Sequence, residues 1–357
     1  MGIFKSKIEK AIKGYSFDDV LLVPSYSDVK LEEIDVSTRI ANGLTLKIPI
    51  ISSPMDTVTG RDMVLSLGKL GGLGVVPRNI DVEAVISIVR EAVEKNVPVG
   101  VAVGPFDDER VEKAVSSGAS IIVIDTAHGH SKNVIDATRR YSRHGVPVMA
   151  GNIVTSEAAE ALIQAGASSL RVGVGPGHAC VTREVTGVGY PQLSAIAEVS
   201  DIASEHGVSV IADGGIEKPG DIVKAIATGA DAVMLGYLLA GSDESPTQKI
   251  IVNGECYKPY RGMGSKTSLS RGSTRYGSFK SVPEGAEGLV RCTGPVKKTI
   301  EYLVGSLKQG MGYVGARTIE ELKTKSRFII VSGGTYREGG PRGLIEAKGS
   351  WEQLSSM

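Results

Sequence analysis

Eight short apolar runs, each followed by a stretch of helical periodicity, constrain the fold of this chain more than any other feature. The runs are continuous rather than alternating, as in parallel strands whose two faces are both buried. They occupy residues 49–53, 73–76, 98–103, 120–125, 147–152, 169–173, 208–213 and 231–235. Helical patterns of about 10 to 15 residues separate them. The sequence therefore predicts an α/β fold, a closed (β/α)8 TIM barrel.

Glycines and polar residues mark opposite ends of the predicted strands. A glycine followed by Ala or Val, typical of a helix C-cap, precedes five of them: Gly118, Gly145, Gly166, Gly207 and Gly229. Polar groups and one glycine gather after the strands: Ser53, Asp125, Asn152, Cys180, Asp213 and Gly236. In a barrel the strand carboxyl ends form the active face, so we expect these residues to share one mouth. An open doubly wound sheet is the alternative, but no GxGxxG follows the first strand.

Length and charge bound the organisation of the chain. Its 357 residues could form two modest domains, but we expect one catalytic barrel over residues 1–357. Lys plus Arg and Asp plus Glu both number 40, which argues against nucleic acid or an anionic membrane as a partner. No apolar run approaches the roughly 20 residues of a membrane span, and the N-terminus has no signal-peptide pattern. We therefore expect a cytoplasmic protein.

The three cysteines, Cys180, Cys256 and Cys292, lie far apart in the sequence. This spacing predicts neither a disulfide framework nor a thiolate metal site, and it indicates a reducing compartment. Cys180 follows an alternation of glycines in GVGPGHACVTRE, which suits a backbone that adopts positive φ or lets a ligand approach closely. Inward-facing amides in such a turn stabilise a thiolate or a nearby anion. A buried, inert cysteine is the alternative.

Residues 241–296 are rich in Gly, Ser, Lys and Arg and poor in aliphatic residues. Long loops of this kind are either functional lids or solvated surface loops, and both interpretations stay open from composition alone. Residues 297–325 have a helical pattern, and a glycine-rich tail follows. His128 and His130 indicate loop packing rather than metal binding, since no third ligand accompanies them.

A set of motifs covers nearly the whole chain: YSFDDVLLVPSYSDV, IPIISSPMDTVT, VIDTAHGHS, GVGPGHACVTRE, IADGGI, VMLGYLLAG, YRGMGS, the pair Arg275-Tyr276 and SVPEGAEG. In this order they resemble the purine-nucleotide oxidoreductases that comprise inosine monophosphate (IMP) dehydrogenase and guanosine monophosphate (GMP) reductase. SSPMDTVT, RGMGS and Arg275-Tyr276 resemble the dehydrogenases, whereas TGVGYPQLSA is similar to the reductases. Residues 76–98 join the second strand to the third directly, so the paired regulatory CBS modules that usually interrupt this family's barrel are absent here.

The resemblance implies NAD-dependent oxidation of IMP to xanthosine monophosphate. Cys180 is expected to attack C2 of the purine, which then passes hydride to NAD and leaves a covalent thioimidate. A flap of about residues 262–296 is expected to close and hydrolyse it, with Arg275, Tyr276 and Thr182 activating water. Two alternatives remain: a GMP reductase that deaminates GMP with NADPH, and a non-catalytic barrel that binds nucleotides.

The resemblance also implies binding residues and an assembly. Substrate contacts are expected at Ser53, Met55, His178, Asp213, Gly215, Gly236, Tyr237, Tyr260, Gly262, Met263, Gly264 and Glu284. Cofactor contacts are expected at Asp125, Thr126, Gly173 and Gly175. Potassium is expected on the carbonyls of Gly175, Gly177 and Cys180, completed by Glu338, Gly339 and Gly340 of a neighbouring subunit. This implies a homotetramer, with residues 327–357 as a subunit-contact tail.

Two positions depart from the family pattern at the end of the site that faces the substrate phosphate. His178 stands where the family usually has serine, and Tyr237 where it has serine or glycine. Imidazole and phenol can still hydrogen-bond to phosphate, but both are larger. We expect the catalytic cycle to be kept and the phosphate pocket to be altered.

Overall fold

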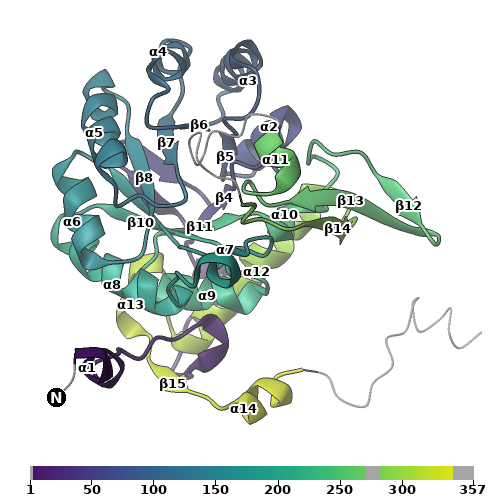
Figure 1. Ribbon diagram of the computed structural model, residues 1–357. Coiled ribbons are helices and arrows are strands. Elements are labelled where there is room, and N and C mark those ends of the chain that lie inside the picture. Colours follow the sequence, from purple (N-terminus) through teal and green to yellow (C-terminus); the bar gives the residue numbers. More distant parts are fainter. Residues whose placement is uncertain (1–2, 271–281, 341–357) are drawn as a thin grey trace, which may run out of the picture.

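The computed structural model describes residues 3–270 and 282–340 and contains a closed barrel of eight parallel strands (Figure 1). In chain order the strands are β4 (Ile50–Ser52), β5 (Leu73–Val76), β6 (Val99–Val103), β7 (Ile121–Asp125), β8 (Val148–Ile153), β9 (Ser169–Val172), β10 (Ser209–Asp213) and β11 (Ala232–Leu235). Each pairs with the next, and β11 pairs with β4 to close the ring. The predicted TIM barrel is confirmed.

Helices surround the barrel as the predicted periodicity requires. They are α2 (Arg61–Lys69), α3 (Val82–Glu94), α4 (Asp108–Ser116), α5 (Lys132–Tyr141), α6 (Ser156–Gln164), α8 (Gln192–Glu205), α9 (Pro219–Ala227) and α12 (Val296–Val314). The last packs against both α9 and α2 and closes the outer layer. After β5 the chain passes through α3 directly into β6.

Five glycines take the left-handed conformation expected of helix C-caps. Their φ angles are +98° at Gly118, +75° at Gly145, +98° at Gly166, +64° at Gly207 and +121° at Gly229. A side chain is strained at such angles, so these glycines let each helix turn back towards its strand. They lie at the end of the barrel opposite the mouth.

The barrel interior is a packed core rather than a channel. Side chains from seven of the eight strands, among them Ile51, Ile121 and Met149, fill it. The hairpin of β2 (Thr38–Ala41) and β3 (Leu44–Leu46) adds Ile40 and Leu46 to the same cluster, which places it over the amino ends of the strands. The hairpin thus covers the core at the amino ends, and the carboxyl ends are the face on which barrel sites form.

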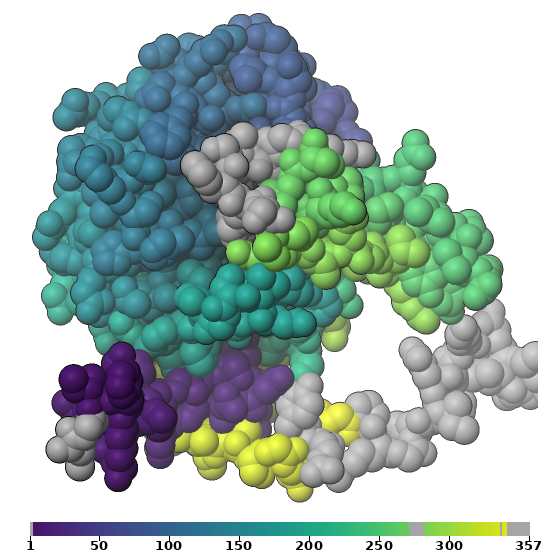
Figure 2. Space-filling model, in the orientation of Figure 1, coloured from purple at the N-terminus to yellow at the C-terminus, as the bar shows by residue number. Residues whose placement is uncertain are grey.

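The two ends of the described chain meet beside the barrel. After the short helix α1 (Ile3–Glu9), strand β1 (Val20–Leu22) pairs antiparallel with β15 (Phe328–Ile330), and Figure 2 shows these segments side by side. Helix α13 (Ile319–Lys325) precedes β15 in the chain, and α14 (Gly333–Glu338) follows it. Within the described ranges no helix is both long and apolar enough to cross a bilayer.

Residues 241–296 hold more regular structure than either interpretation of the sequence anticipated. After α10 (Tyr237–Ala240), strands β12 (Ile250–Val252), β13 (Glu255–Arg261) and β14 (Glu287–Arg291) form an antiparallel sheet that projects from the barrel as an arm (Figures 1 and 2). The helix α11 (Lys266–Ser270) follows β13. β12 is apolar but exposed, and β13 and β14 mix charged with apolar residues, so the pattern of a strand buried on both faces is absent.

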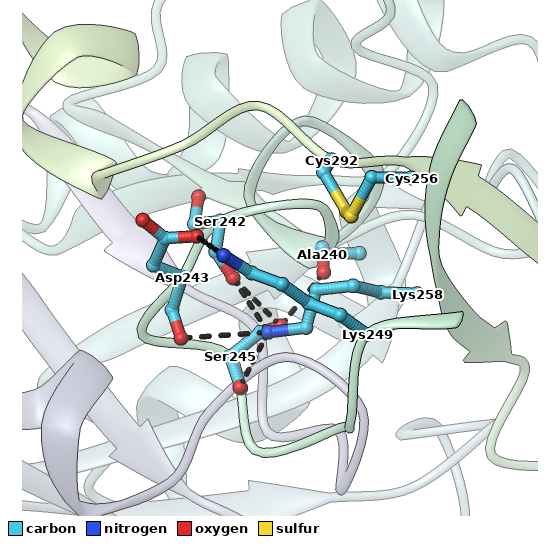
Figure 3. Close-up of a disulfide and its surroundings, with 8 residues drawn as sticks. All are labelled: Ala240, Ser242, Asp243, Ser245, Lys249, Cys256, Lys258 and Cys292. Atoms are coloured by element: carbon cyan, nitrogen blue, oxygen red, sulfur yellow. Dashed lines mark hydrogen bonds and ion pairs between the residues drawn. A yellow bond between two sulfur atoms is a disulfide. The ribbon is translucent and has the colours of Figure 1, made fainter. Parts of the chain in front are cut away.

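A disulfide joins Cys256 to Cys292, which corrects the prediction that the cysteines are unpaired (Figure 3). The two residues are 36 positions apart, but the pairing of β13 with β14 continues to them, and the Cys292 amide donates to the Cys256 carbonyl over 3.0 Å. Sequence separation hid this cross-strand pair. Cys180 is the remaining thiol, so the cysteine argument for a reducing compartment no longer stands.

Lys258 fastens the arm to the barrel near the disulfide. Its side chain is 1% exposed, and its ammonium donates to the carbonyls of Ser242 and Ser245, each over 2.8 Å (Figure 3). A third carbonyl, that of Asp243, lies 3.4 Å away. Because a buried ammonium needs partners for its three hydrogens, these carbonyls fix β13 against the loop after α10.

Candidate active site

The predicted residues meet in a pocket at the carboxyl ends of the barrel strands. Its walls are the turn after β9, the loops after β4 and β10, the end of β13 with the residues that follow it, and the residues just before β14. The lining includes these residues of the predicted site: Ser53, Met55, Gly173, Gly175, Gly177, Cys180, Thr182, Asp213, Tyr260, Gly262, Met263, Gly264 and Glu284. Asn152, whose position after β8 the sequence also marked, lines it as well.

Cys180 lies at the end of the glycine turn, just before α7 (Thr182–Thr186). Gly173 and Gly175 have φ of +145° and +82°, so the turn requires glycine at both positions. The Cys180 amide donates to the Gly177 carbonyl over 2.9 Å, which closes the turn and directs the thiol to the pocket. The alternative of an inert, fully buried cysteine does not fit a half-buried thiol on a pocket wall.

The thiol belongs to a three-residue chain of hydrogen bonds. Cys180 Sγ lies 3.1 Å from Thr182 Oγ1, which donates to Glu284 Oε2 over 3.0 Å. Since threonine has one hydroxyl hydrogen and Glu284 receives it, the Thr182 oxygen accepts from the thiol. The arrangement gives the thiol proton a path to a carboxylate.

Backbone pairing brings Glu284 to this place from the far end of the flap. Cys180 and Gly285 form an isolated β-bridge, and the Val181 amide donates to the Glu284 carbonyl over 3.1 Å. A Cβ on Gly262 would lie 2.6 Å from the Ala179 carbonyl oxygen. Only glycine at this position, just after β13, therefore lets the arm approach the loop that carries Cys180. The arm therefore forms one wall of the site.

A buried ion-pair network lies beneath the pocket. Arg171 is 2% exposed and bonds to Asp125 over 2.5 Å and to Asp213 over 2.9 Å. Asn152 donates to the same Asp213 oxygen over 2.7 Å and to the Gly173 carbonyl over 2.8 Å. One guanidinium serves two carboxylates, and Asp213 is fixed with one face towards the pocket.

Asp125 and Thr126 lie behind this network rather than on the pocket wall. Asp125 has no exposed surface, and Thr126 donates to the Gly151 carbonyl over 2.6 Å. The contact of Asp125 with a cofactor ribose stays a prediction, and it requires the buried carboxylate to become accessible. Gly173 and Gly175 face the pocket directly.

The predicted phosphate end forms an adjoining corner between the loops after β9, β10 and β11. It is lined by Gly215, Gly236, Tyr237 and His178 together with Asp213 and Tyr260. A Cβ on Gly236 would lie 3.1 Å from the Tyr260 hydroxyl, so this glycine keeps the corner open. Burial, with a smaller contribution from Asp213, raises the pKa of Tyr260, which stays a neutral hydroxyl donor.

The remaining predicted residues divide into two groups. Arg275 and Tyr276 lie outside the described residues. Glu338, Gly339 and Gly340 belong to α14 and the residues after it, and α14 lies apart from α7 in this chain (Figure 1). Their contact with the glycine turn of another copy stays a prediction. In the described ranges no three His, Cys, Asp or Glu side chains gather as metal ligands.

Sequence reasoning missed two buried residues that organise the site. Arg171 interrupts an apolar strand, and a charge inside a predicted barrel strand was the signal that a carboxylate partner lies nearby. Gln192, at the start of α8, donates to the carbonyls of Val172 and Asp213 over 2.9 and 3.2 Å and ties β9 to β10. It had no comparable signal, because glutamine is common in helices.

The fold and the site define a class: a (β/α)8 barrel with a free thiol in a pocket at the carboxyl ends of its strands. The model of the IMP dehydrogenase / GMP reductase domain matches residues 14–342. The chain belongs to this family and is an oxidoreductase.

Relatives that bear one name match over almost their whole length. The inosine-5'-monophosphate dehydrogenase of Cryptosporidium parvum is 39% identical over 91% of this chain and 94% of that protein. The protein of the same name from Borreliella burgdorferi is 38% identical over 95% of this chain and 99% of that protein. The one from Thermoplasma acidophilum is 34% identical over 96% of this chain and 97% of that protein. The last alignment spans 469 positions against 357 residues here, so it leaves gaps in this chain.

Proposed function

We propose that this protein is an IMP dehydrogenase, which oxidises IMP at C2 to xanthosine monophosphate with NAD as hydride acceptor. The observation that carries the proposal is the contact of Cys180 with Thr182 and Glu284 on the pocket wall. The names of the relatives support the dehydrogenase over the GMP reductase. The substrate is a small nucleotide in either case.

The thiol, its threonine and the carboxylate carry out the covalent step. As Cys180 Sγ attacks C2, its proton passes to the Thr182 oxygen while the Thr182 proton moves to Glu284. Nucleophilic catalysis of this kind replaces one difficult step by two easier ones. In the second step water attacks C2, the proton held by Glu284 returns through Thr182 to the departing sulfur, and the proton lost by the water passes to solvent. Arg275 and Tyr276 assist this hydrolysis.

Asp213 binds the hydroxyls of the substrate ribose. Its carboxylate accepts two hydrogen bonds from a diol, and the bonds from Arg171 and Asn152 hold it in place. This fixes the sugar and thereby sets the height of C2 above the sulfur. Orientation of this kind accounts for several powers of ten in rate.

The cofactor and potassium fit the glycine turn. NAD takes the hydride when it is bound, and Gly173 and Gly175 offer backbone without a side chain in the way. Potassium prefers oxygen ligands such as the carbonyls of Gly175, Gly177 and Cys180. The Gly177 carbonyl already accepts one hydrogen bond, but a carbonyl has two lone pairs. A homotetramer completes this site through the C-terminal residues 338–340.

We also infer that the protein works in the cytoplasm without the family's regulatory CBS modules. The direct passage from β5 through α3 to β6, and the gaps in the longer alignments, support their absence. The activity should therefore show no response to adenine or guanine nucleotides at a separate site.

Quenched turnover tests the proposal. Enzyme mixed with IMP and NAD, then denatured within milliseconds and digested, should carry a purine adduct on the Cys180 peptide by mass spectrometry. Cys180→Ala should lack both the adduct and NADH formation, while Glu160→Gln, on an outer helix away from the pocket, keeps both. Ammonia release from GMP with NADPH would favour the reductase instead, and turnover by Cys180→Ala would favour other chemistry.

A further inference from the structure

The corner at the phosphate end is closed by two stacked rings. The imidazole of His178 lies on the ring of Tyr237 with centroids 3.8 Å apart and planes at 18°. Tyr237 meets Tyr260 edge to face at 6.2 Å. The rings come from three loops, those after β9 and β11 and the end of β13, so the stack holds the corner's walls together.

A carboxylate fixes the orientation of the imidazole. Nδ1 of His178 lies 3.3 Å from Glu217 Oε1, and both side chains line the corner. Because Nδ1 is engaged by Glu217, Nε2 is the ring nitrogen left to meet a ligand. Glu217 and Asp213 add further acceptors to the corner.

The chemistry of the corner suits a hydrogen-bond donor better than a dianion. Among the described residues that line it, none is a lysine or arginine. A phosphate monoester at neutral pH carries about −1.5 to −2 charge and offers acceptor oxygens. A 5′-hydroxyl instead offers an O–H to Nε2 or to a carboxylate. The amides of Gly214 and Gly215, with φ of +90° and +77°, can serve either group.

We infer that this corner, set by His178, Tyr237 and Glu217, makes the enzyme accept a purine nucleoside almost as well as its 5′-monophosphate. The inference rests on the proposed function, because it concerns the substrate of the same site. Glu217 acts here as a specificity-determining residue that does not touch the reacting atoms. Its carboxylate repels the phosphate and fixes the orientation of the imidazole.

Kinetics with IMP and inosine, at saturating NAD, test the inference. We expect kcat/KM for IMP to exceed that for inosine by less than about 100-fold. Glu217→Gln should raise this preference at least threefold through a lower KM for IMP, with kcat unchanged. A merely structural role would lower both substrates' kcat/KM together. The matched control is Glu160→Gln, since Glu160 makes a similar pair with His206 at 3.2 Å and similar exposure on the outer helices.

A larger preference for IMP in the unmodified enzyme, or a preference that Glu217→Gln leaves unchanged, overturns the inference. Calorimetric titration with IMP and inosine separates its failure from that of the proposed function. If neither compound yields NADH, the proposed function fails. The inference is then decided by the ratio of the two dissociation constants, and a preference for IMP above about 100-fold overturns it. If neither compound binds, both are wrong.

Discussion

The Cys256–Cys292 disulfide should stabilise the folded chain by a large fraction of its total stability. It closes a ring of residues 36 positions apart, and it joins strands that also carry Tyr260 and Glu284 to the pocket. In the chain-entropy model a ring of this size removes about 13 cal/mol/K from the unfolded state, or about 4 kcal/mol at 25 °C. Reduction should therefore lower the free energy of unfolding by about that amount.

The arm can also open without the barrel, which sharpens the measurement. Denaturant unfolding, followed with and without a thiol reductant, gives the loss in the free energy of global unfolding. Hydrogen exchange at the β13 amides, Lys258 among them, measures the local free energy of opening of the arm. Reduction should remove a larger fraction of this local free energy than of the global free energy of unfolding. Cys256→Ser with Cys292→Ser should behave like the reduced protein and should no longer respond to reductant.

Two results would refute this reasoning. Thiol titration of the unreduced, denatured protein should find one thiol, that of Cys180; three thiols would show that the bond does not form. A change below about 1 kcal/mol on reduction, with the bond present beforehand, would show that the unfolded ensemble is not restricted as the model assumes.

Three further outcomes follow from single contacts. Lys258→Met should destabilise the protein by about 3 kcal/mol in thermal unfolding, because it leaves buried carbonyls unpaired. Arg171→Met should reduce kcat/KM at least 100-fold in the NADH assay with the barrel's circular dichroism retained, since two carboxylates then repel each other. Backbone and hydroxyl bonds from Ser16 lower the pKa of Asp19, so its stabilisation is present above about pH 4 and lost below it; Asp19→Asn should flatten that acid limb of stability against pH.

The sequence predicted the barrel well because its strands are buried on both faces. Continuous apolar runs and the capping glycines, such as Gly118 and Gly229, follow from local rules that hold wherever the chain lies. The arm was missed because its strands have no continuous apolar run of this length; β13, for example, has the sequence ECYKPYR. Its β12 consists of three exposed residues, Ile250–Val252, and no periodicity marks it as a strand.

The site was predictable only as far as single positions carry their own signal. Cys180 and Asp213 stand at strand ends, and the structure brings both to one pocket. The Cys256–Cys292 bond depends on which strands pair across 36 residues, and the burial of Asp125 depends on Arg171 from another strand. Both are consequences of tertiary pairing that local patterns do not contain.

The pairing of β11 with β4 imposes an order on biosynthesis. Until residue 235 has left the ribosome, the nascent chain holds seven strands as an open sheet with two unpaired edges, which other chains could join. Strand β1 waits longer still, for a partner about 300 residues later in the chain. Slow translation of the last third should therefore promote aggregation of this protein, and a chaperone that shields the edges should raise its yield.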